Sequence, residues 1–232
     1  MITLLLATRN PHKVEEIQAL LNSAVPCLTL RDFPTAPTII EDAPTFAGNA
    51  AKKARDLARW LGALPGGELP FPLPSSLWVL ADDSGLEVDA LGGAPGVHSA
   101  RFAAVGGPAD GNSPDPENNA KLLRLLGTVP ADRRTARFRC VLALARVTAP
   151  AASTSGPGEP DLPVAFFSGC CEGSIGFTPH GAAGFGYDPL FLPNGQELSF
   201  AELGAAEKNR ISHRSQALAA LRDHLSHRLI PT

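Results

Sequence analysis

The first segments of the chain read as a buried strand that leads directly into a helix. Residues 2–7 are almost all apolar and cover the length of one strand. Asn10 is a favoured N-cap residue and Pro11 a favoured first helical residue, and apolar side chains then recur at helical spacing from Val14 to Leu21. A strand joined to a helix by so short a loop predicts an α/β fold.

The same alternation of strands and helices continues along the chain. Apolar spacing and capping residues predict further helices that begin near Thr45, Asp115, Ser199 and Ser212. Apolar or alternating runs predict strands over residues 77–80, 137–145 and 164–168, the last two as a hairpin. We therefore expect a mixed β-sheet with flanking helices in a single domain over residues 1–232.

Composition limits the classes of partner. The net charge is −3 and no long run of like charge occurs, which argues against a nucleic-acid-binding surface. The four cysteines form no CxxC pair, as expected for reduced thiols of a cytoplasmic protein. The N-terminal apolar run lacks a basic start, and no later run is long enough to cross a membrane. We expect a cytoplasmic protein with no nucleic-acid or membrane partner.

Glycine and proline, at 22 residues each, gather in two stretches. These lie near residues 62–76 and 149–163. Patterned segments continue on both sides of each stretch, so we expect loops inserted in one domain rather than linkers between domains.

Two adjacent carboxylates, Asp82 and Asp83, follow the apolar run of residues 77–80. The pattern predicts that the strand ends there in a Ser-Gly turn. Ligands of open α/β sheets bind just outside the carboxyl ends of strands, and a carboxylate pair there suits a divalent metal. Acidic residues are also common in turns after strands, so the pair alone leaves a structural role open. Glu41 is a second candidate hard-oxygen ligand, and by itself reads as an ordinary loop acid.

Polar and basic side chains gather in two places that suit phosphate. Between the first strand and the first helix, a hydroxyl, an amide and an ammonium group from Thr8, Asn10 and Lys13 meet at a helix start, where backbone N–H groups attract anions. Read alone, this segment is better explained as a capped helix with a solvated lysine. On the second expected helix, Lys53 borders the apolar stripe while Lys52 points away from it. Lys53 is therefore the lysine expected to reach a cleft beside the core.

Two downstream motifs supply aromatic and cationic side chains. The segment Phe185-Gly186-Tyr187-Asp188-Pro189 follows a glycine-rich stretch, and an aromatic ring beside glycines can stack on a flat base. The segment Ser212-His213-Arg214 adds an imidazole and a guanidinium at a helix start. The alternative for the first segment is a hairpin turn with a core phenylalanine, and the alternative for the second is a surface histidine at a helix start. Together with the acidic pair, these motifs indicate an enzyme that acts on a nucleotide polyphosphate.

Taken in order, these segments resemble the inosine triphosphate pyrophosphatase family, the Ham1-like pyrophosphatases of non-standard purine nucleotides. The resemblance covers nearly the whole chain. The matching pieces are Thr8-x-Asn10-x-x-Lys13, Thr45-Phe46 with Asn49-Ala50-x-x-Lys53-Ala54, Asp82-Asp83-Ser84-Gly85-Leu86, Leu91-Gly92-Gly93-Ala94-Pro95-Gly96-Val97, Ser99-Ala100-Arg101, Phe185-Gly186-Tyr187-Asp188-Pro189, Lys208 and Ser212-His213-Arg214.

The resemblance implies an elongated mixed α/β fold with two lobes around a central cleft, and a homodimer. It also implies hydrolysis of ITP, dITP and XTP to the monophosphate and pyrophosphate with Mg²⁺, which removes these nucleotides from the pool. Attack at the α-phosphorus is part of what the resemblance implies.

The family's functional residues fall on definite positions of this chain. By resemblance, Asp83 is the catalytic acid and metal-associated residue, and Glu41 is a metal ligand. The positions that would hold the phosphates are Thr8, Asn10, Lys13, Lys53 and Ser84. The positions that would line the base-binding region are Phe185, Gly186, Tyr187, Asp188, Lys208, His213 and Arg214.

Two residues depart from the family pattern. Arg9 stands where a small residue is common, which could alter the phosphate loop. Gly48 replaces an acid that is often present, so metal binding there depends more on Glu41. Two other functions stay open: a Maf-type pyrophosphatase of pyrimidine or modified nucleotides, and a catalytically silent nucleotide-binding module. The Phe185 and His213 motifs argue against the first, and the retained acids argue against the second.

Overall fold

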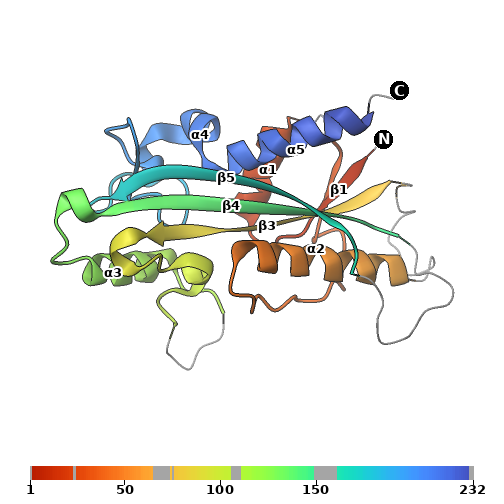
Figure 1. Ribbon diagram of the computed structural model, residues 1–232, viewed down its shortest axis with the longest axis horizontal. Coiled ribbons are helices and arrows are strands. Elements are labelled where there is room, and N and C mark those ends of the chain that lie inside the picture. Colours follow the sequence, from red (N-terminus) through yellow and green to blue (C-terminus); the bar gives the residue numbers. More distant parts are fainter. Residues whose placement is uncertain are drawn as a thin grey trace. The chain divides into compact units, whose positions relative to one another are not determined.

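The computed structural model of the chain describes residues 2–22, 25–64, 74, 76–105, 111–148 and 161–229. The strands are β1 (Thr3–Leu6), β2 (Cys27–Thr29), β3 (Leu77–Val88), β4 (Thr135–Arg146), β5 (Val164–Ile175) and β6 (Phe191–Pro193). The α-helices are α1 (Pro11–Leu21), α2 (Phe46–Ala63), α3 (Asp115–Leu125), α4 (Phe200–Ile211) and α5 (His213–Leu229) (Figure 1). Short 3₁₀ helices cover Asp89–Leu91, Gly96–Arg101 and Ala131–Arg133.

The strands form a six-stranded mixed sheet in the order β2-β1-β3-β4-β5-β6. Strand β1 pairs in parallel with both β2 and β3, whereas β5 and β6 pair antiparallel. Parallel neighbours need a crossover connection, which α1 and α2 provide. The expected mixed sheet with flanking helices is confirmed.

The turn predicted at Asp82-Asp83-Ser84-Gly85 is wrong, because these residues belong to strand β3. The strand does not end after Leu80 but continues to Val88. Polar residues with a glycine resemble a turn by composition, but here buried contacts on both faces of the strand outweigh that local preference. Gly85 in particular accommodates Ser99, because a Cβ at Gly85 would lie 2.4 Å from the Ser99 hydroxyl oxygen.

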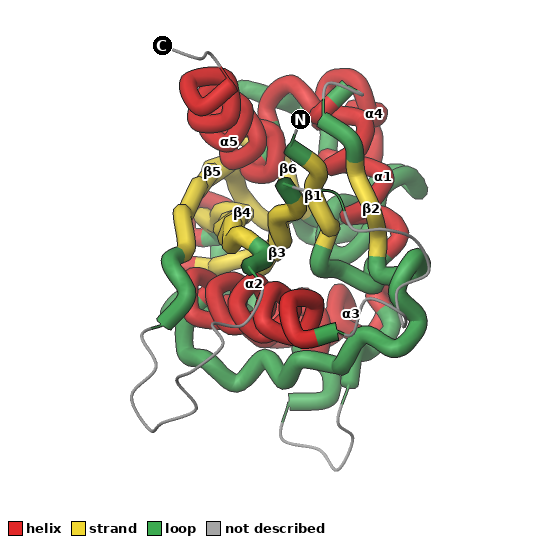
Figure 2. Tube along the Cα trace, turned by 90° about the vertical axis from the view of Figure 1, so that its right-hand side faces the viewer, coloured by secondary structure: helices red, strands yellow, loops and turns green. Residues whose placement is uncertain are grey.

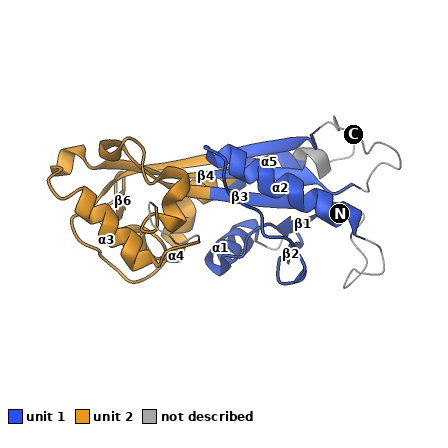
Figure 3. Ribbon diagram, turned by 90° about the horizontal axis from the view of Figure 1, so that it is seen from below, with its two compact units in different colours: residues 1–83, 141–167, 218–232 blue, residues 84–140, 168–217 orange. Residues whose placement is uncertain are grey.

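The chain divides into two compact units, coloured in Figure 3. Unit 1 comprises residues 1–83, 141–167 and 218–232, and unit 2 comprises residues 84–140 and 168–217. The long strands β3, β4 and β5 and the helix α5 contribute residues to both units.

In unit 1 the sheet is covered by helices on both faces. Figures 1 and 2 show α2 on one face and α1 and α5 on the other. Thr45 caps α2. The apolar stripe of this helix is buried against the sheet, as the spacing predicted, and consists of Ala50, Ala54, Leu57 and Leu61. Burying apolar area on both faces makes these strands almost continuously hydrophobic.

Unit 2 has its own core around the second half of β3 and the first half of β4. Phe138, Phe191 and Phe200 pack together with ring centroids 4.8–5.8 Å apart. Leu122 and Leu126 close this core from the side of α3. Leu125 of the same predicted helix is about half exposed, because it lies on the far face.

The remaining expectations divide into three groups. The capping box at Ser199 is confirmed, since the Ser199 N–H donates to Glu202, and Ser212 caps α5 through the N–H of Ser215. The expected strand 164–168 is too short, because β5 extends to Ile175. Most of the two glycine- and proline-rich stretches, residues 65–73, 75 and 149–160, lies outside the described residues. Over the part of the chain that the structure describes, no helix is long and apolar enough to span a membrane.

Candidate active site

Asp82 and Asp83 are consecutive residues of β3, so their side chains point to opposite faces of the sheet. Asp82 accepts a hydrogen bond from the Lys13 ammonium of α1 at 2.5 Å. Asp83 faces α2, where the Asn49 amide donates to its Oδ2 at 3.1 Å. Both residues are buried: Asp82 is 2% exposed and Asp83 is 5% exposed. The two acids therefore serve different faces, and only Asp83 shares the α2 side with Glu41 and Lys53.

Lys53 joins three of the predicted residues. Its ammonium donates to the backbone oxygen of Asp82 at 2.8 Å and lies 3.1 Å from Glu41 and 3.7 Å from Asp83. Lys52, one residue earlier, pairs with the exposed Asp42 at 2.6 Å. The prediction that Lys53 and not Lys52 faces inward is confirmed. We call Lys13, Glu41, Lys53, Asp82 and Asp83 the acid–lysine cluster.

Burial changes the proton affinity of Asp83. Loss of hydration raises the pKa of Asp83 to about 6, against the lowering influence of Lys53 and Lys13. The nearby Glu41 carboxylate raises this pKa further, and the hydrogen bond from Asn49 lowers it. A carboxyl group with a pKa close to neutral can act as a general base under physiological conditions.

The acid–lysine cluster contains carboxylates that fit a hard divalent cation. Glu41 and Asp83 both approach the Lys53 ammonium, so their oxygens already face one positive charge. Within the described residues no group of three His, Cys, Asp or Glu side chains forms a complete metal site. Mg²⁺ commonly takes one or two carboxylates and fills its other positions with water and substrate phosphates. The residues present fit that pattern.

The predicted phosphate loop is held by its own polar side chains. The Thr8 hydroxyl accepts from the Asn10 N–H at 3.1 Å. Asn10 in turn caps α1, accepting from the N–H groups of His12 at 2.9 Å and Lys13 at 3.3 Å. Thr8 and Asn10 thus shape the helix start, and of the three predicted residues here only Lys13 belongs to the acid–lysine cluster.

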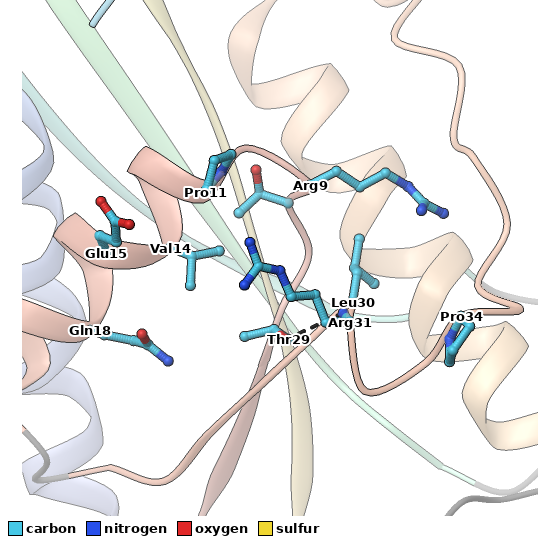
Figure 4. A pocket seen from close by; sticks show the side chains of 10 residues that line it. Arg9, Pro11, Val14, Glu15, Gln18, Thr29, Leu30, Arg31 and Pro34 are labelled. Carbon is cyan, nitrogen blue, oxygen red and sulfur yellow. Dashed lines mark hydrogen bonds between the residues drawn. The ribbon is translucent and has the colours of Figure 1, made fainter. Parts of the chain in front are cut away.

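Arg9, the departure from the family pattern, lines a pocket in unit 1 together with Thr8 (Figure 4). This pocket has a volume of about 670 Å³ and lies between α1 and the segment after β2. Its α1 wall is formed by Pro11, Val14, Glu15 and Gln18, on the face of the helix opposite Lys13. The Arg9 side chain extends away from α1 and donates to the backbone oxygen of Ala36 at 2.8 Å. This hydrogen bond ties the phosphate loop to the segment after β2, on the side of α1 away from Lys13.

The predicted base-binding residues come together in unit 2 around Asp188. Its Oδ2 accepts from the backbone N–H of Phe185 at 2.9 Å and from the Lys208 ammonium at 2.5 Å. The ammonium lies 4.8 Å from the centre of the Phe185 ring, and the Arg214 guanidinium lies 5.9 Å from it. Two cations beside one aromatic ring provide hydrogen-bond donors for a flat ring with acceptor atoms. We call Phe185, Asp188, Lys208 and Arg214 the aromatic–cation group.

The neighbours of this group have distinct surroundings. Arg214 is buried and donates to the hydroxyl of Ser84 at 2.8 Å. His213 stacks on Phe138 with ring centroids 4.9 Å apart and an angle of 11° between the planes. The phenol of Tyr187 is buried and donates to the backbone oxygen of Ser99 at 2.9 Å, and burial raises its pKa. The Tyr187 hydroxyl thus anchors the turn to the core of unit 2.

Asp115, Asn119 and Asn49 help to build the site, although none of them is among the predicted site residues. Gly186 is held by α3: its N–H donates to Asp115 at 2.6 Å, and its carbonyl accepts from Asn119 at 3.0 Å. Asn49, fully buried on α2, contacts Asp83. A usable sequence signal exists for Asn49, since a buried amide within a stripe of alanines requires a polar partner.

Known proteins are similar to this chain in sequence and in fold over nearly its whole length. A dITP/XTP pyrophosphatase of Shouchella clausii is 43% identical over 223 residues, or 96% of each chain, and one of Desulforamulus reducens is 47% identical over 93% of this chain and 91% of its own. A solved HAM1 protein from Coxiella burnetii superposes with a TM-score of 0.75 at 35% identity, covering 98% of this chain and 100% of that one. The sequence profile of the Ham1 family matches residues 4–224, and this chain therefore belongs to the Ham1 family.

Proposed function

We propose that this protein hydrolyses dITP, ITP and XTP to the nucleoside monophosphate and pyrophosphate. The observation that carries the proposal is the arrangement of Asp83, Glu41 and Lys53 around one point, in a chain that aligns over almost its full length with dITP/XTP pyrophosphatases. Hydrolysis of a triphosphate depends mainly on positioning and charge stabilisation. The acid–lysine cluster supplies both.

The phosphate end of the substrate belongs to the acid–lysine cluster. Lys13 and Lys53 neutralise phosphate oxygens once they exchange part of their contact with Asp82 and Glu41 for contact with substrate. Asp83 orients the attacking water and accepts its proton, and attack at the α-phosphorus then releases pyrophosphate. Glu41 and Asp83 would hold Mg²⁺, which would supply further charge neutralisation for the leaving group.

The base end belongs to the aromatic–cation group. Phe185 offers a ring for stacking, and Lys208 and Arg214 only donate hydrogen bonds. Hypoxanthine and xanthine present an acceptor oxygen at C6, whereas adenine presents an amino group. The group therefore favours 6-keto purines over adenine.

The direct test is to incubate the pure protein with dITP and Mg²⁺ and to measure both products. We expect one pyrophosphate for each monophosphate, no free phosphate before added pyrophosphatase, and no turnover with excess EDTA. Release of phosphate and dIDP, or activity indifferent to EDTA, would contradict the proposal.

The homodimer is also a proposal, and sedimentation equilibrium of the pure protein tests it.

A further inference from the structure

Asn49 is a fully buried side chain on the first turns of α2, and it makes two hydrogen bonds. Its Oδ1 accepts from the backbone N–H of Ala43 at 2.9 Å. Its Nδ2 donates to Oδ2 of Asp83 at 3.1 Å, across 34 residues of sequence. One amide therefore links the Asp83 strand to the segment that carries Glu41, two residues before Ala43.

The chemistry of the partners fixes which way this amide points. The N–H of Ala43 can only donate, so it requires the oxygen of the amide. An ionised carboxylate can only accept, so Asp83 requires the NH₂ group. Reversing the amide would set oxygen against oxygen and N–H against N–H. The side chain thus has one orientation, and through it the carboxylate of Asp83 has a preferred one.

The two bonds determine what remains available at the site. Oδ2 of Asp83 is engaged by Asn49, which leaves Oδ1 on the side of the Lys53 ammonium, at 3.7 Å. The same ammonium lies 3.1 Å from Glu41. Because Asn49 also holds Ala43, this side chain links the position of the Asp83 carboxylate to that of the Glu41 segment.

We propose that Asn49 is a positioning residue that aligns the carboxylates of Asp83 and Glu41 for cation binding and catalysis. The inference rests on the proposed function but concerns a residue outside the reacting groups. Residues that orient metal-binding carboxylates commonly affect metal affinity or activity by about 10–100-fold when they are removed. A purely structural amide would affect stability instead.

Unit 2 offers a matched control. Asn118 is 1% exposed, and its Oδ1 accepts from the Ala103 N–H at 2.7 Å, while its Nδ2 donates to the backbone oxygens of Ser113 and Ala100 at 3.3 and 3.4 Å. None of these partners is a predicted site residue. Asn118 is therefore as buried and as well bonded as Asn49, but it connects only backbone.

The experiment compares Asn49→Ala and Asn118→Ala with the wild-type protein. Three quantities are measured: kcat and KM for dITP, the dissociation constant of Mn²⁺ by electron paramagnetic resonance without nucleotide, and the melting temperature. For Asn49→Ala we expect a fall in kcat of about 10–100-fold, weaker Mn²⁺ binding by about tenfold and a small change in KM. For Asn118→Ala we expect a lower melting temperature with kcat and Mn²⁺ binding close to wild type.

Several results would overturn the inference. Equal Mn²⁺ affinity in wild type and Asn49→Ala, or equal losses of kcat in the two alanine variants, would reduce Asn49 to a structural residue. If Asn49→Ala does not fold, Asn49→Ser provides the same comparison, because its hydroxyl is too short to hold both partners. A wild-type protein that leaves dITP intact would refute the proposed function, while the Mn²⁺ comparison would still test Asn49.

Discussion

The acid–lysine cluster and the aromatic–cation group balance buried charge in opposite ways. In the first, the three carboxylates of Glu41, Asp82 and Asp83 face two ammonium groups. In the second, two cations lie beside the Phe185 ring, and one of them, Lys208, pairs with the carboxylate of Asp188. Surplus carboxylate suits a metal cation, and surplus cation suits a keto oxygen. On the proposed function, this difference places bond cleavage at the first region and base choice at the second.

Residues that serve the two regions are adjacent in the sequence but belong to different units. Asp83 is the last residue of its segment in unit 1, and Ser84, which accepts from Arg214, is the first of its segment in unit 2. Alternation along β3 gives these neighbours different partners. A substitution can therefore alter one function without altering the other, and the following predictions use this separation.

The largest expected effect belongs to Asp83→Asn. The amide has nearly the shape of the carboxylate but can neither accept the proton of water nor carry the charge that a cation needs. We expect kcat for dITP to fall by about 10²–10⁴-fold, with the ratio of kcat/KM for dITP over dATP unchanged. Steady-state kinetics with both nucleotides checks this, and a variant with near wild-type kcat would remove Asp83 from the mechanism.

Lys53→Ala should follow, with Lys52→Ala as its matched control. Lys53 is buried among Asp82, Asp83 and Glu41, whereas Lys52 pairs with Asp42 at the surface. Losing a charged hydrogen-bond donor to phosphate costs about 1.5–3 kcal/mol, so we expect kcat/KM to fall by roughly 10–100-fold for Lys53→Ala. Lys52→Ala should stay within about twofold. Equal losses at the two positions would contradict the separation of the helix faces.

The pH dependence should report the same region. Burial raises the pKa of Asp83 to about 6 from an ordinary value near 3.8. In the proposed mechanism the ionised form of Asp83 is the base, and its fraction falls as the pH drops through about 6, by about tenfold for each further unit. We expect kcat/KM at low Mg²⁺ to decline below pH 6, and the decline to move to lower pH as Mg²⁺ increases. A flat profile between pH 7 and 5 would exclude Asp83 as the base.

Arg214→Gln should alter base choice more than bond cleavage. Arg214 donates to Ser84 and lies beside the Phe185 ring, and a 6-amino group cannot accept the hydrogen bond that a 6-keto oxygen would accept, at a cost of about 1–3 kcal/mol. We expect the preference for dITP over dATP to shrink by about tenfold. The matched comparison is Asp83→Asn, whose preference should be intact. An unchanged ratio in Arg214→Gln would remove Arg214 from base recognition.

The sequence predicts local structure and charge placement well where the information is local. The cap at Asn10, the capping box at Ser199 and the inward side of Lys53 all follow from spacing within one helix, and the structure confirms them. The end of β3 is predicted wrongly, because Asp82 and Asp83 have the composition of a turn. Their partners Lys13 and Asn49 lie 69 and 34 residues away, beyond the reach of a local pattern.

Contacts between distant segments also explain which site residues are missed. Asp115 and Asn119 hold Gly186 although 71 and 67 residues separate them in the sequence. Tyr187 carries a family position, but its hydroxyl turns to the backbone of Ser99. A motif therefore identifies which residues are present, and only the packing determines which atom of each faces the ligand.

The smallest effect is expected for Arg9→Gly, which restores a small residue in the phosphate loop. Arg9 belongs to neither region: its guanidinium donates to the backbone oxygen of Ala36 and lines a pocket on the face of α1 opposite Lys13. Removing this partly exposed hydrogen bond costs about 0.5–1.5 kcal/mol, so we expect the melting temperature to fall by a few degrees. Because Thr8 and Asn10 hold the loop by their own bonds, kcat/KM for dITP should stay within about twofold. Measured beside Lys53→Ala, a tenfold loss in Arg9→Gly would mean that Arg9 contacts phosphate and that the acid–lysine cluster extends to this loop.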